Sequence, residues 1–459
     1  MILKQKPFKI AFILFFLAFF LRFFNFWHPQ QVVFDEAHFG LYASKYAKGE
    51  YYFDIHPPGG KLIFAAIASF PKNNSFNFQI NTRYPSEVWP SILKIRFLNV
   101  VLGSLLVVII FYLALELNLS LKIATLAALW VSLDNALIVE SRLVLLNTIL
   151  IFFIFLSILL YLRLKKIPFK SPKWYFQAFI LSICLGIAIS IKVNGFILLA
   201  FIILNEIINS KFSFKNFLTK SFFYILIPFS IYVGFFAIHL SLLKTECTSN
   251  CGYVFDIILG PKQSHPILTN KIPQGNFWNN FINLNIRIIT DNIYGLNHWT
   301  YSSKFYQWPF GWKPILYFYQ NEGSGSNISA IYLSSNFISW WLATFGILLF
   351  VLMLIKSILK KQNFYLEDNL LLIFELWLFF LLPFLIVQRF ALMYHYFVPL
   401  ILSILFTLGF IEYHFKKLGK ILPYILVVLV LGFVYFAPIT YGFAIPHNLF
   451  EKLYFFLPK

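Results

Sequence analysis

Charged residues are scarce in this 459-residue chain, and acidic residues are the scarcer kind. Only 12% of the residues are charged, and 18 Asp and Glu stand against 37 Lys and Arg. A soluble domain averages about 25% charged residues, so this composition excludes a string of soluble domains. Hydrophobic residues make up 59% of the chain, in runs near the ~20 residues that cross a bilayer. The sequence predicts a single membrane-embedded domain over residues 1–459.

The excess of positive charge, +19, does not indicate a nucleic-acid partner. A nucleic-acid site gathers Lys and Arg on one face, whereas many of them here lie in short loops between apolar runs, as the positive-inside rule requires. The first apolar run is long, and no small-residue cleavage site follows it. We therefore interpret it as a membrane anchor and not as a cleaved signal peptide.

The apolar runs predict an all-α polytopic membrane protein with about eleven transmembrane helices. Basic clusters follow alternate runs, so all of them lie on one side if the N-terminus is cytoplasmic. This orientation puts two long loops outside, 28–92 and 244–332, and their many aromatic residues favour helices lying in the membrane interface. The predicted spans are 8–26, 93–115, 121–139, 146–163, 176–191, 194–209, 221–243, 333–355, 369–388, 391–412 and 421–440.

The chain has only three cysteines, and they decide little about function. Cys184 lies inside an apolar run and is expected to be a core residue. Cys247 and Cys251 flank three residues of the second external loop. A disulfide in an oxidising compartment and two free thiols are both compatible with that spacing.

Two adjacent acids at the outer boundary of the first span are the most informative feature of the sequence. Asp35 and Glu36 follow the first apolar run within a few residues. A hydroxyl nucleophile needs a proton acceptor, and a half-buried carboxylate is more basic than one in water. Asp35 is therefore predicted to be a general base, and a solvated loop that helps cap a helix is the alternative. Glu36 points elsewhere on a helix and need not share that role.

Two histidines and a lysine accompany the acids in the first external loop. His38 and His56 are chemically sufficient, with the acids, for a metal site, but no His-Glu-x-x-His spacing supports one. No metal is therefore expected. Pro57 and Pro58 instead predict an extended turn after His56, followed by a short interfacial helix that starts at Lys61.

Isolated cations at the outer ends of predicted spans indicate an anion site. Arg142, Lys192 and Arg389 all lie on the outer side, against the inside bias of basic residues. Arginine at such a place is costly unless it pairs or binds an anion, and a guanidinium binds phosphate bidentately. For Arg142 the alternatives are a salt bridge to Glu140 and a side chain that snorkels to the interface.

Aromatic residues are frequent in the second external loop. Tyr306 and Trp308 suit stacking against a sugar, and they equally suit an aromatic belt at the membrane interface. The run Tyr394-His395-Tyr396 opens a later span near the outer face, and core packing is expected for it.

These segments together resemble the protein O-mannosyltransferases, membrane glycosyltransferases of the C-type fold. The resemblance rests on residues 34–40, 53–58 with Lys61, 141–146, 190–195 and 302–309, which occur in the order found in that family. It implies an inverting transfer of mannose from a polyprenyl-phosphate donor to Ser or Thr hydroxyls of an acceptor protein. It also implies that no metal or other cofactor is needed.

The resemblance also implies roles for single residues. Asp35 would take the acceptor proton as a catalytic base, and Glu36 would hold the acceptor or the local loop. Arg142 and Lys192, with Arg389, would bind the donor phosphate and stabilise its developing charge, which is usually a large catalytic effect. The residues expected to bind acceptor or sugar, or to shape the loops, are His38, His56, Lys61, Tyr306 and Trp308.

Two departures from the family pattern leave the acceptor and the sugar open. Gly59-Gly60 follows Pro58 where the family usually has a residue such as Leu, and Asn147 stands where Asp is common. The main alternative is transfer of a different sugar to a lipid or glycan. A transporter is less favoured, because polar residues lie mainly at the outer ends of the spans and not at mid-span.

The second external loop is too short for the sugar-binding-like repeat domain of the eukaryotic enzymes. A bacterial-type member is therefore expected, in the inner membrane, with its active site facing outside the cytoplasm. Its expected partners are membrane lipid, the lipid-linked sugar and an acceptor protein. Whether the chain forms a dimer stays open.

Overall fold

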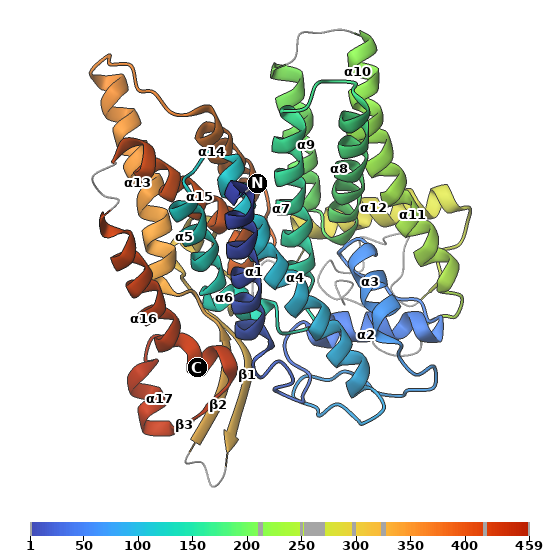
Figure 1. The fold of residues 1–459 in the computed structure, drawn as a ribbon. Coiled ribbons are helices and arrows are strands. Elements are labelled where there is room, and N and C mark those ends of the chain that lie inside the picture. Colours follow the sequence, from blue (N-terminus) through green and yellow to red (C-terminus); the bar gives the residue numbers. More distant parts are fainter. Residues whose placement is uncertain are drawn as a thin grey trace.

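Long helices packed side by side make up most of the protein, with a small sheet at one end (Figure 1). The computed structural model describes residues 2–209, 214–247, 251, 271–295, 300–322, 327–415 and 420–457. In Figure 1 the chain enters the first helix, α1 (Ile2–Phe23), at the upper end of the bundle. The last long helix, α16 (Leu422–Tyr441), finishes at the lower end.

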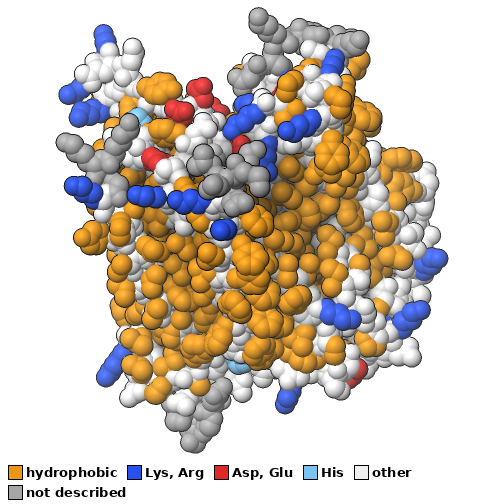
Figure 2. Space-filling model, in the orientation of Figure 1, with side chains coloured by type: hydrophobic (Ala, Val, Ile, Leu, Met, Phe, Trp, Pro, Cys, Tyr) orange, Lys and Arg blue, Asp and Glu red, His pale blue; other side chains and the backbone are white. Residues whose placement is uncertain are grey.

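Eight helical segments of the described chain are long and apolar enough to cross a membrane. Apolar side chains form a broad band over the face seen in Figure 2, and most Lys and Arg side chains lie above this band. The eight segments are Trp89–Glu116 (α4), Leu146–Lys165 (α7), Pro172–Ile191 (α8), Asn216–Leu242, Phe337–Leu359 (α13), Asp368–Leu385, Met393–His414 and Leu422–Tyr441 (α16). Three of them combine shorter elements: Asn216–Leu242 contains most of α10 (Phe214–Ser221), η1 (Phe222–Leu226) and α11 (Ile227–Leu242), Asp368–Leu385 contains α14 (Asp368–Leu381) and η4 (Leu382–Leu385), and Met393–His414 contains η5 (Met393–Tyr396) and α15 (Phe397–His414).

The remaining predicted spans correspond to shorter or less apolar helices. The predicted span 121–139 is divided into α5 (Leu121–Ser132) and α6 (Asn135–Glu140), because Asp134 lies between them and caps α6 by accepting from the Leu137 amide. The predicted span 194–209 is α9 (Gly195–Asn209). The count of eleven crossings stays a prediction.

Side-chain caps fix where several helices begin. Ser120, Ser171, Asn276 and Asn336 each precede a helix and accept a hydrogen bond from a backbone amide of its first turn. Such a cap contributes about 1 kcal/mol to helix stability. Polar residues at these borders therefore set the limits of helices whose interiors are almost wholly apolar.

The two predicted external loops contain helices. The first holds α2 (Glu36–Lys48) and α3 (Gly59–Ala68), and the second holds α12 (Phe277–Tyr294). Helix α2 ends at Gly49, whose φ of 71° is left-handed, the usual conformation of a glycine after a helix. Helix α3 starts at Gly59, two residues before the predicted start.

The helical fold is as predicted, and a three-stranded antiparallel sheet that the sequence did not predict lies at the lower end of the bundle (Figure 1). Strand β1 (Ile315–Glu322) pairs with β2 (Asn327–Leu333), and β2 pairs with β3 (Ala444–Pro446). The short helix α17 (His447–Leu453) follows β3. The sheet therefore ties the end of the described chain to the second external loop.

Contacts between helices bring the two predicted external loops to the same end of the bundle. Helix α4 packs on α1, α5 and α7, and α7 in turn packs on α8. On the other side, α15 packs on α5, α13 and α14. In Figure 1 the links α7–α8 and α13–α14 lie at the upper end, whereas α2, α3 and the sheet lie in the lower half. The acidic motif is thus remote from the basic links, as the sequence predicts.

Candidate functional site

Asp35 lies immediately before α2 in a loop with unusual backbone geometry. The preceding residue, Phe34, has a φ of 44°, in the left-handed region. Asp35 stands at the N-cap position of α2, yet its side chain makes no capping hydrogen bond. The residue is half-buried, and within the described ranges its carboxylate accepts no hydrogen bond. This carboxylate is therefore available to an incoming donor such as a hydroxyl group.

The surroundings of Asp35 make its carboxylate unusually basic. Burial raises the pKa of Asp35 above its ordinary 3.8, and the nearby Asp54 carboxylate also raises it. His38, Lys192 and Arg389 oppose that rise through their charges. Two of the three predicted phosphate-binding cations thus lie close enough to Asp35 to act on its charge.

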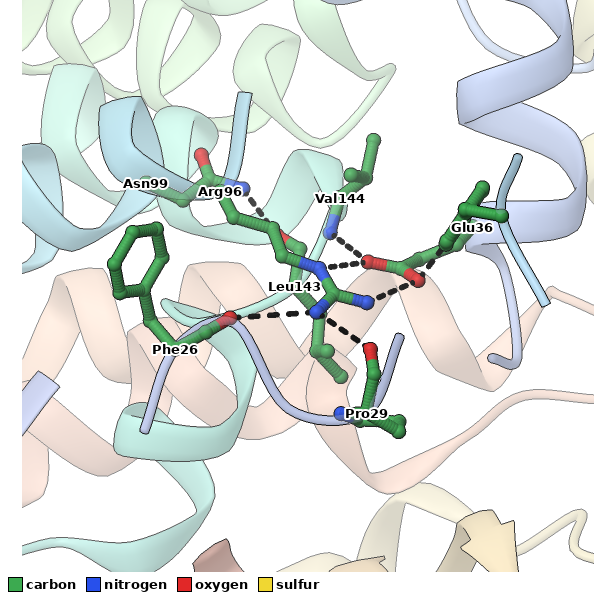
Figure 3. A network of polar contacts seen from close by, with 8 residues as sticks. Phe26, Pro29, Glu36, Arg96, Asn99, Leu143 and Val144 are labelled. Carbon is green, nitrogen blue, oxygen red and sulfur yellow. Dashed lines mark hydrogen bonds and ion pairs between the residues drawn. The ribbon is translucent and has the colours of Figure 1, made fainter. Parts of the chain in front are cut away.

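Glu36, the neighbouring acid, forms a buried ion pair with Arg96 (Figure 3). Arg96, from α4, donates from Nη2 to Glu36 Oε2 at 2.8 Å and from Nε to Oε1 at 2.9 Å. The Val144 amide donates to Oε1 at 2.9 Å, and the Tyr84 hydroxyl donates to Oε2 at 3.1 Å. Both carboxylate oxygens are therefore occupied, and no side of the carboxylate faces a substrate.

Glu36, grouped with Asp35 as a candidate catalytic acid in the sequence, connects several segments of the chain through this network. Its side chain is fully buried and joins the start of α2 to three other segments: the link between α3 and α4, helix α4 and the turn before α7. The same Arg96 donates from Nη1 to the carbonyls of Phe26 and Pro29 at 3.3 and 2.9 Å. Glu36 therefore fixes the loop that carries Asp35, which is the second of the two roles expected for it.

Arg142 donates to backbone carbonyl groups, so its contacts lend no support to the predicted phosphate-binding role, which stays a prediction. Its Nη1 donates to the Thr440 carbonyl at 2.5 Å, and its Nη2 donates to the Asn25 carbonyl at 2.6 Å. The guanidinium also lies over the Tyr441 ring, 4.7 Å from the centroid. Arg142 thus joins the end of α16 to the segment after α1. The alternative salt bridge to Glu140 is not formed either.

Lys192 follows α8 and points into the site. Its Nζ donates to Asn147 Oδ1 at 2.8 Å and lies 5.0 Å from the centroid of the Tyr394 ring. Burial lowers the pKa of this ammonium, while the carboxylates of Asp35 and Glu140 act in the opposite direction. A buried ammonium beside two carboxylates is a ready partner for an anionic ligand. Tyr394, for which core packing was expected, is part of its surroundings.

A further buried carboxylate, Glu140, belongs to the same neighbourhood. Tyr317 in β1 donates its hydroxyl to Glu140 Oε1 at 2.6 Å, and Asn147 Nδ2 donates to Oε2 at 3.1 Å. The Tyr317 ring stacks on Phe34 with centroids 4.2 Å apart. The sequence assigns none of these residues to the site: it presents Glu140 only as a partner of Arg142, and Asn147 only as a departure from the family pattern. A lone acid at the end of an apolar run is nevertheless a signal that it needs partners.

Arg389 approaches the site from the link between α14 and α15. The residue is half-buried, and its Nη1 donates to Asn292 Oδ1 at 3.2 Å. Asn292, in α12, donates in turn to the Ile55 carbonyl at 2.6 Å. The charge of Arg389 acts on both Asp35 and His56. Five parts of the sequence thus interact electrostatically around the Asp35 carboxylate: the first external loop and the segments that carry Glu140, Lys192, Tyr317 and Arg389.

Comparison with known proteins identifies the family. Residues 12–244 match the family described as dolichyl-phosphate-mannose-protein mannosyltransferase. Residues 277–457 match a second description, the C-terminal four-transmembrane region of protein-O-mannosyltransferase. The chain belongs to this mannosyltransferase family.

Curated relatives are similar over half of the chain. Dolichyl-phosphate-mannose–protein mannosyltransferase 4 of Saccharomyces cerevisiae is 34% identical over 240 residues, which are 49% of this chain and 31% of the yeast protein. Protein O-mannosyltransferase 1 of Drosophila melanogaster is 33% identical over 229 residues, 47% of this chain and 26% of the fly protein. The matched segment thus spans about a third or less of these relatives.

Solved structures share the fold over nearly the whole chain. The S. cerevisiae protein O-mannosyltransferase Pmt1-Pmt2 complex bound to the sugar donor gives a TM-score of 0.83 at 18% identity, covering 98% of this chain and 92% of that one. The archaeal oligosaccharyltransferase AglB from Archaeoglobus fulgidus gives 0.52 at 11% identity, covering 96% and 56%. At such identities the likeness concerns the fold alone.

In this mannosyltransferase family member, Lys61 and His56 shape the first external loop. Lys61 Nζ donates to Asp54 Oδ2 at 2.5 Å and to the His56 carbonyl at 2.6 Å. Both partners of the Lys61–Asp54 ion pair are buried. Burial lowers the pKa of His56 well below its usual value, and the cations of Lys192, Lys61 and Arg389 lower it further. His56 is therefore neutral at physiological pH.

His38, Trp308 and Tyr306 have three different environments in the fold. His38 is half-buried, one helical turn after Asp35. Trp308 is fully buried, donates to Ser303 Oγ at 3.0 Å and stacks on His395, so its place is in the core. Tyr306 is 61% exposed. The expected sugar-stacking role of Trp308 and Tyr306 therefore receives no support from their contacts.

The described residues of the mannosyltransferase chain also bear on the predictions for metal ligands and cysteines. No group of three or more His, Cys, Asp or Glu residues that could hold a metal is present there. Cys247 and Cys251 are joined by a disulfide, which decides between the two states left open by the sequence. Cys184 is free and buried, as expected of a core residue.

Proposed function

We propose that this protein transfers mannose from a polyprenyl- or dolichyl-phosphate donor to Ser or Thr hydroxyls of an acceptor protein. The single observation that carries the proposal is the Asp35 carboxylate, which is half-buried, without a hydrogen bond in the described chain, and within the electrostatic influence of Lys192 and Arg389. Membership of a family named for this reaction supports it.

The proposed chemistry needs one base and a pair of cations. Asp35 takes the proton of the acceptor hydroxyl as its oxygen attacks the anomeric carbon of mannose. The bond from that carbon to the phosphate oxygen breaks, and its electron pair leaves with the phosphate, so the configuration is inverted. Lys192 and Arg389 offset the charge that develops on the phosphate, and electrostatic stabilisation of this kind is usually the largest catalytic effect. The phosphate leaves without a proton.

The reaction is proposed for the outer face of a bacterial inner membrane. Support comes from the separation of the basic links, at the upper end in Figure 1, from α2 and α3 at the lower end. Basic links favour the cytoplasmic side, so the Asp35 end faces outward. The proposed partners are membrane lipid, the lipid-linked sugar and the acceptor protein, and pairing with a second copy stays a prediction.

A reconstituted reaction tests this proposal. Purified protein in lipid nanodiscs is incubated with radiolabelled polyprenyl-phosphate mannose and a Ser/Thr-rich peptide. We expect mannosylated peptide from the wild-type protein and none from a matched peptide with Ala at every Ser and Thr. Transfer to a lipid or glycan acceptor alone, or from a donor with a different sugar alone, would overturn the proposal.

A further inference from the structure

Asn147 uses both ends of its amide group inside the site. It lies in the first turn of α7 and is buried. Its Oδ1 accepts from Lys192 Nζ at 2.8 Å, and its Nδ2 donates to Glu140 Oε2 at 3.1 Å. The ammonium can only donate and the carboxylate can only accept, whereas an amide does both. Asn147 therefore satisfies two partners of opposite charge at once.

The two partners of Asn147 would otherwise be suited to each other. Lys192 and Glu140 are both buried, and each acts on the other through its charge. Oppositely charged groups that interact in a low-dielectric interior attract strongly. A direct ion pair would use the Lys192 ammonium internally and leave less of its charge for a ligand.

We infer, on the basis of the proposed role of Lys192 toward the donor phosphate, that Asn147 is a positioning residue. It keeps the Lys192 ammonium apart from Glu140 and holds it toward the space in front of Asp35. Asn147 does not touch the substrate in this scheme and acts through Lys192. The residue thus determines how strongly the lipid-linked donor binds.

The same contacts connect the cation to the loop that carries the base. Glu140 Oε1 accepts from Tyr317, whose ring stacks on Phe34, the residue before Asp35. Between Glu140 and Asn147, the Val144 amide donates to Glu36. The segment 140–147 therefore contacts both Lys192 and the loop that carries Asp35, and Asn147 is the residue of this segment that accepts from Lys192.

Replacement of Asn147 by Leu tests the inference, because Leu has a similar size and neither hydrogen bond. We expect Asn147→Leu to raise the KM for polyprenyl-phosphate mannose about tenfold, a factor within the range for a lost hydrogen bond to a charged group. The KM for the peptide stays near that of the wild type. Thr148→Val is the matched control, since Thr148 is an adjacent buried residue whose hydroxyl has no hydrogen-bond partner in the described structure.

A double-mutant cycle separates action through Lys192 from a general effect on the fold. In a Lys192→Met background, we expect Asn147→Leu to cause no further rise in the donor KM. Two effects that simply add, or equal losses for donor and peptide, would overturn the inference. Absence of any transfer by the wild-type protein is a different result, because it refutes the proposed function and removes the donor role of Lys192 before any variant is made.

A second substitution keeps the test decisive if Asn147→Leu does not accumulate in membranes. Asn147→Asp retains an oxygen that accepts from Lys192, loses the donor toward Glu140 and adds a negative charge beside both groups. We expect its donor KM to rise, because a carboxylate at position 147 pairs directly with the Lys192 ammonium and leaves less of its charge for the donor phosphate. A donor KM equal to that of the wild type would overturn the inference.

Discussion

Asp35 and Glu36 are neighbours in the chain, yet their carboxylates have opposite surroundings. Successive residues at a helix start point in different directions. Glu36 therefore meets Arg96 inside the protein, while Asp35 keeps its oxygens free of hydrogen bonds in the described chain. The sequence predicts a functional acid at this place. It names Asp35 as the base, but it does not predict the buried ion pair of Glu36, because the partner Arg96 lies 60 residues further along the chain.

Removal of the Asp35 charge tests its role as the base. We expect Asp35→Asn to lower the rate of mannose transfer about 100- to 10,000-fold, the usual contribution of a positioned general base. The thermal unfolding temperature stays near that of the wild type, since no hydrogen bond to Asp35 is lost. Transfer assays and a thermal-shift assay on the same preparation measure both. A variant with full activity would exclude Asp35 as the base.

The pH dependence of transfer follows from the surroundings of the same residue. Burial raises the pKa of Asp35 above 3.8, and a base acts only when deprotonated. Activity is therefore present above the raised pKa and is lost as the pH falls through it. We expect the acid limb of kcat/KM, measured from about pH 4 to about pH 8, to have its midpoint above the ordinary Asp value. A midpoint at or below 3.8 would contradict the assignment.

At the scale of elements, Arg142 belongs to a segment that resembles the family, yet its side chain joins two parts of the fold through backbone carbonyl groups. The segment 140–147 between α6 and α7 sends Arg142 toward α16 and Asn147 toward α8. The sequence predicts a cation here, but its direction depends on the carbonyls of Thr440 and Asn25, which are remote in sequence. Tertiary contacts thus decide which of the three predicted cations, Arg142, Lys192 and Arg389, lie near Asp35.

Loss of the Arg142 side chain is expected to act on stability. Arg142→Gln leaves the buried Thr440 carbonyl and the partly buried Asn25 carbonyl without their charged donor, at an expected cost of about 2 kcal/mol. We expect a lower unfolding temperature in detergent and a donor KM equal to that of the wild type. Arg142→Lys restores part of the stability, since an ammonium still donates. An unchanged unfolding temperature with a raised donor KM would return Arg142 to the phosphate site.

The three-stranded sheet is the part of the fold that was not predicted from the sequence. Residues 315–322 and 327–333 are rich in Ile, Tyr and Phe, and a Gly- and Ser-containing stretch separates them, which is a hairpin signal. In a chain with 21% aromatic residues the same letters also suit an interfacial helix. The third strand, β3, lies more than 100 residues away, and no local pattern announces such a pairing.

For the whole molecule, the direction of the chain limits the number of crossings. Helix α1 begins in the upper half of Figure 1 and α16 finishes in the lower half, and an odd number of crossings would carry the chain from one side of a membrane to the other. The eight long apolar segments are an even number. Adding α1, α9 and the α5–α6 pair gives eleven, which agrees in parity with the predicted count.

The orientation of this bundle is open to direct labelling. Asn73, in the link between α3 and α4, and Lys361, in the link between α13 and α14, are both exposed. We expect a membrane-impermeant maleimide to label Asn73→Cys but not Lys361→Cys in intact cells, because basic links stay on the cytoplasmic side. Both label after lysis, and the parent protein gives the background. The reverse pattern would place Asp35 on the cytoplasmic side.

The hydrogen bond from the Val144 amide to Glu36 has a consequence for sequence variation. Position 144 contributes its main chain to this contact, so apolar side chains of similar volume leave the bond intact. Proline has no N–H group and removes it. In a library of all substitutions at position 144, selected for mannose transfer, we expect Ile and Leu to be retained and proline to be lost. The side chain of Val144 alone would not predict this result, because the contact uses its backbone N–H.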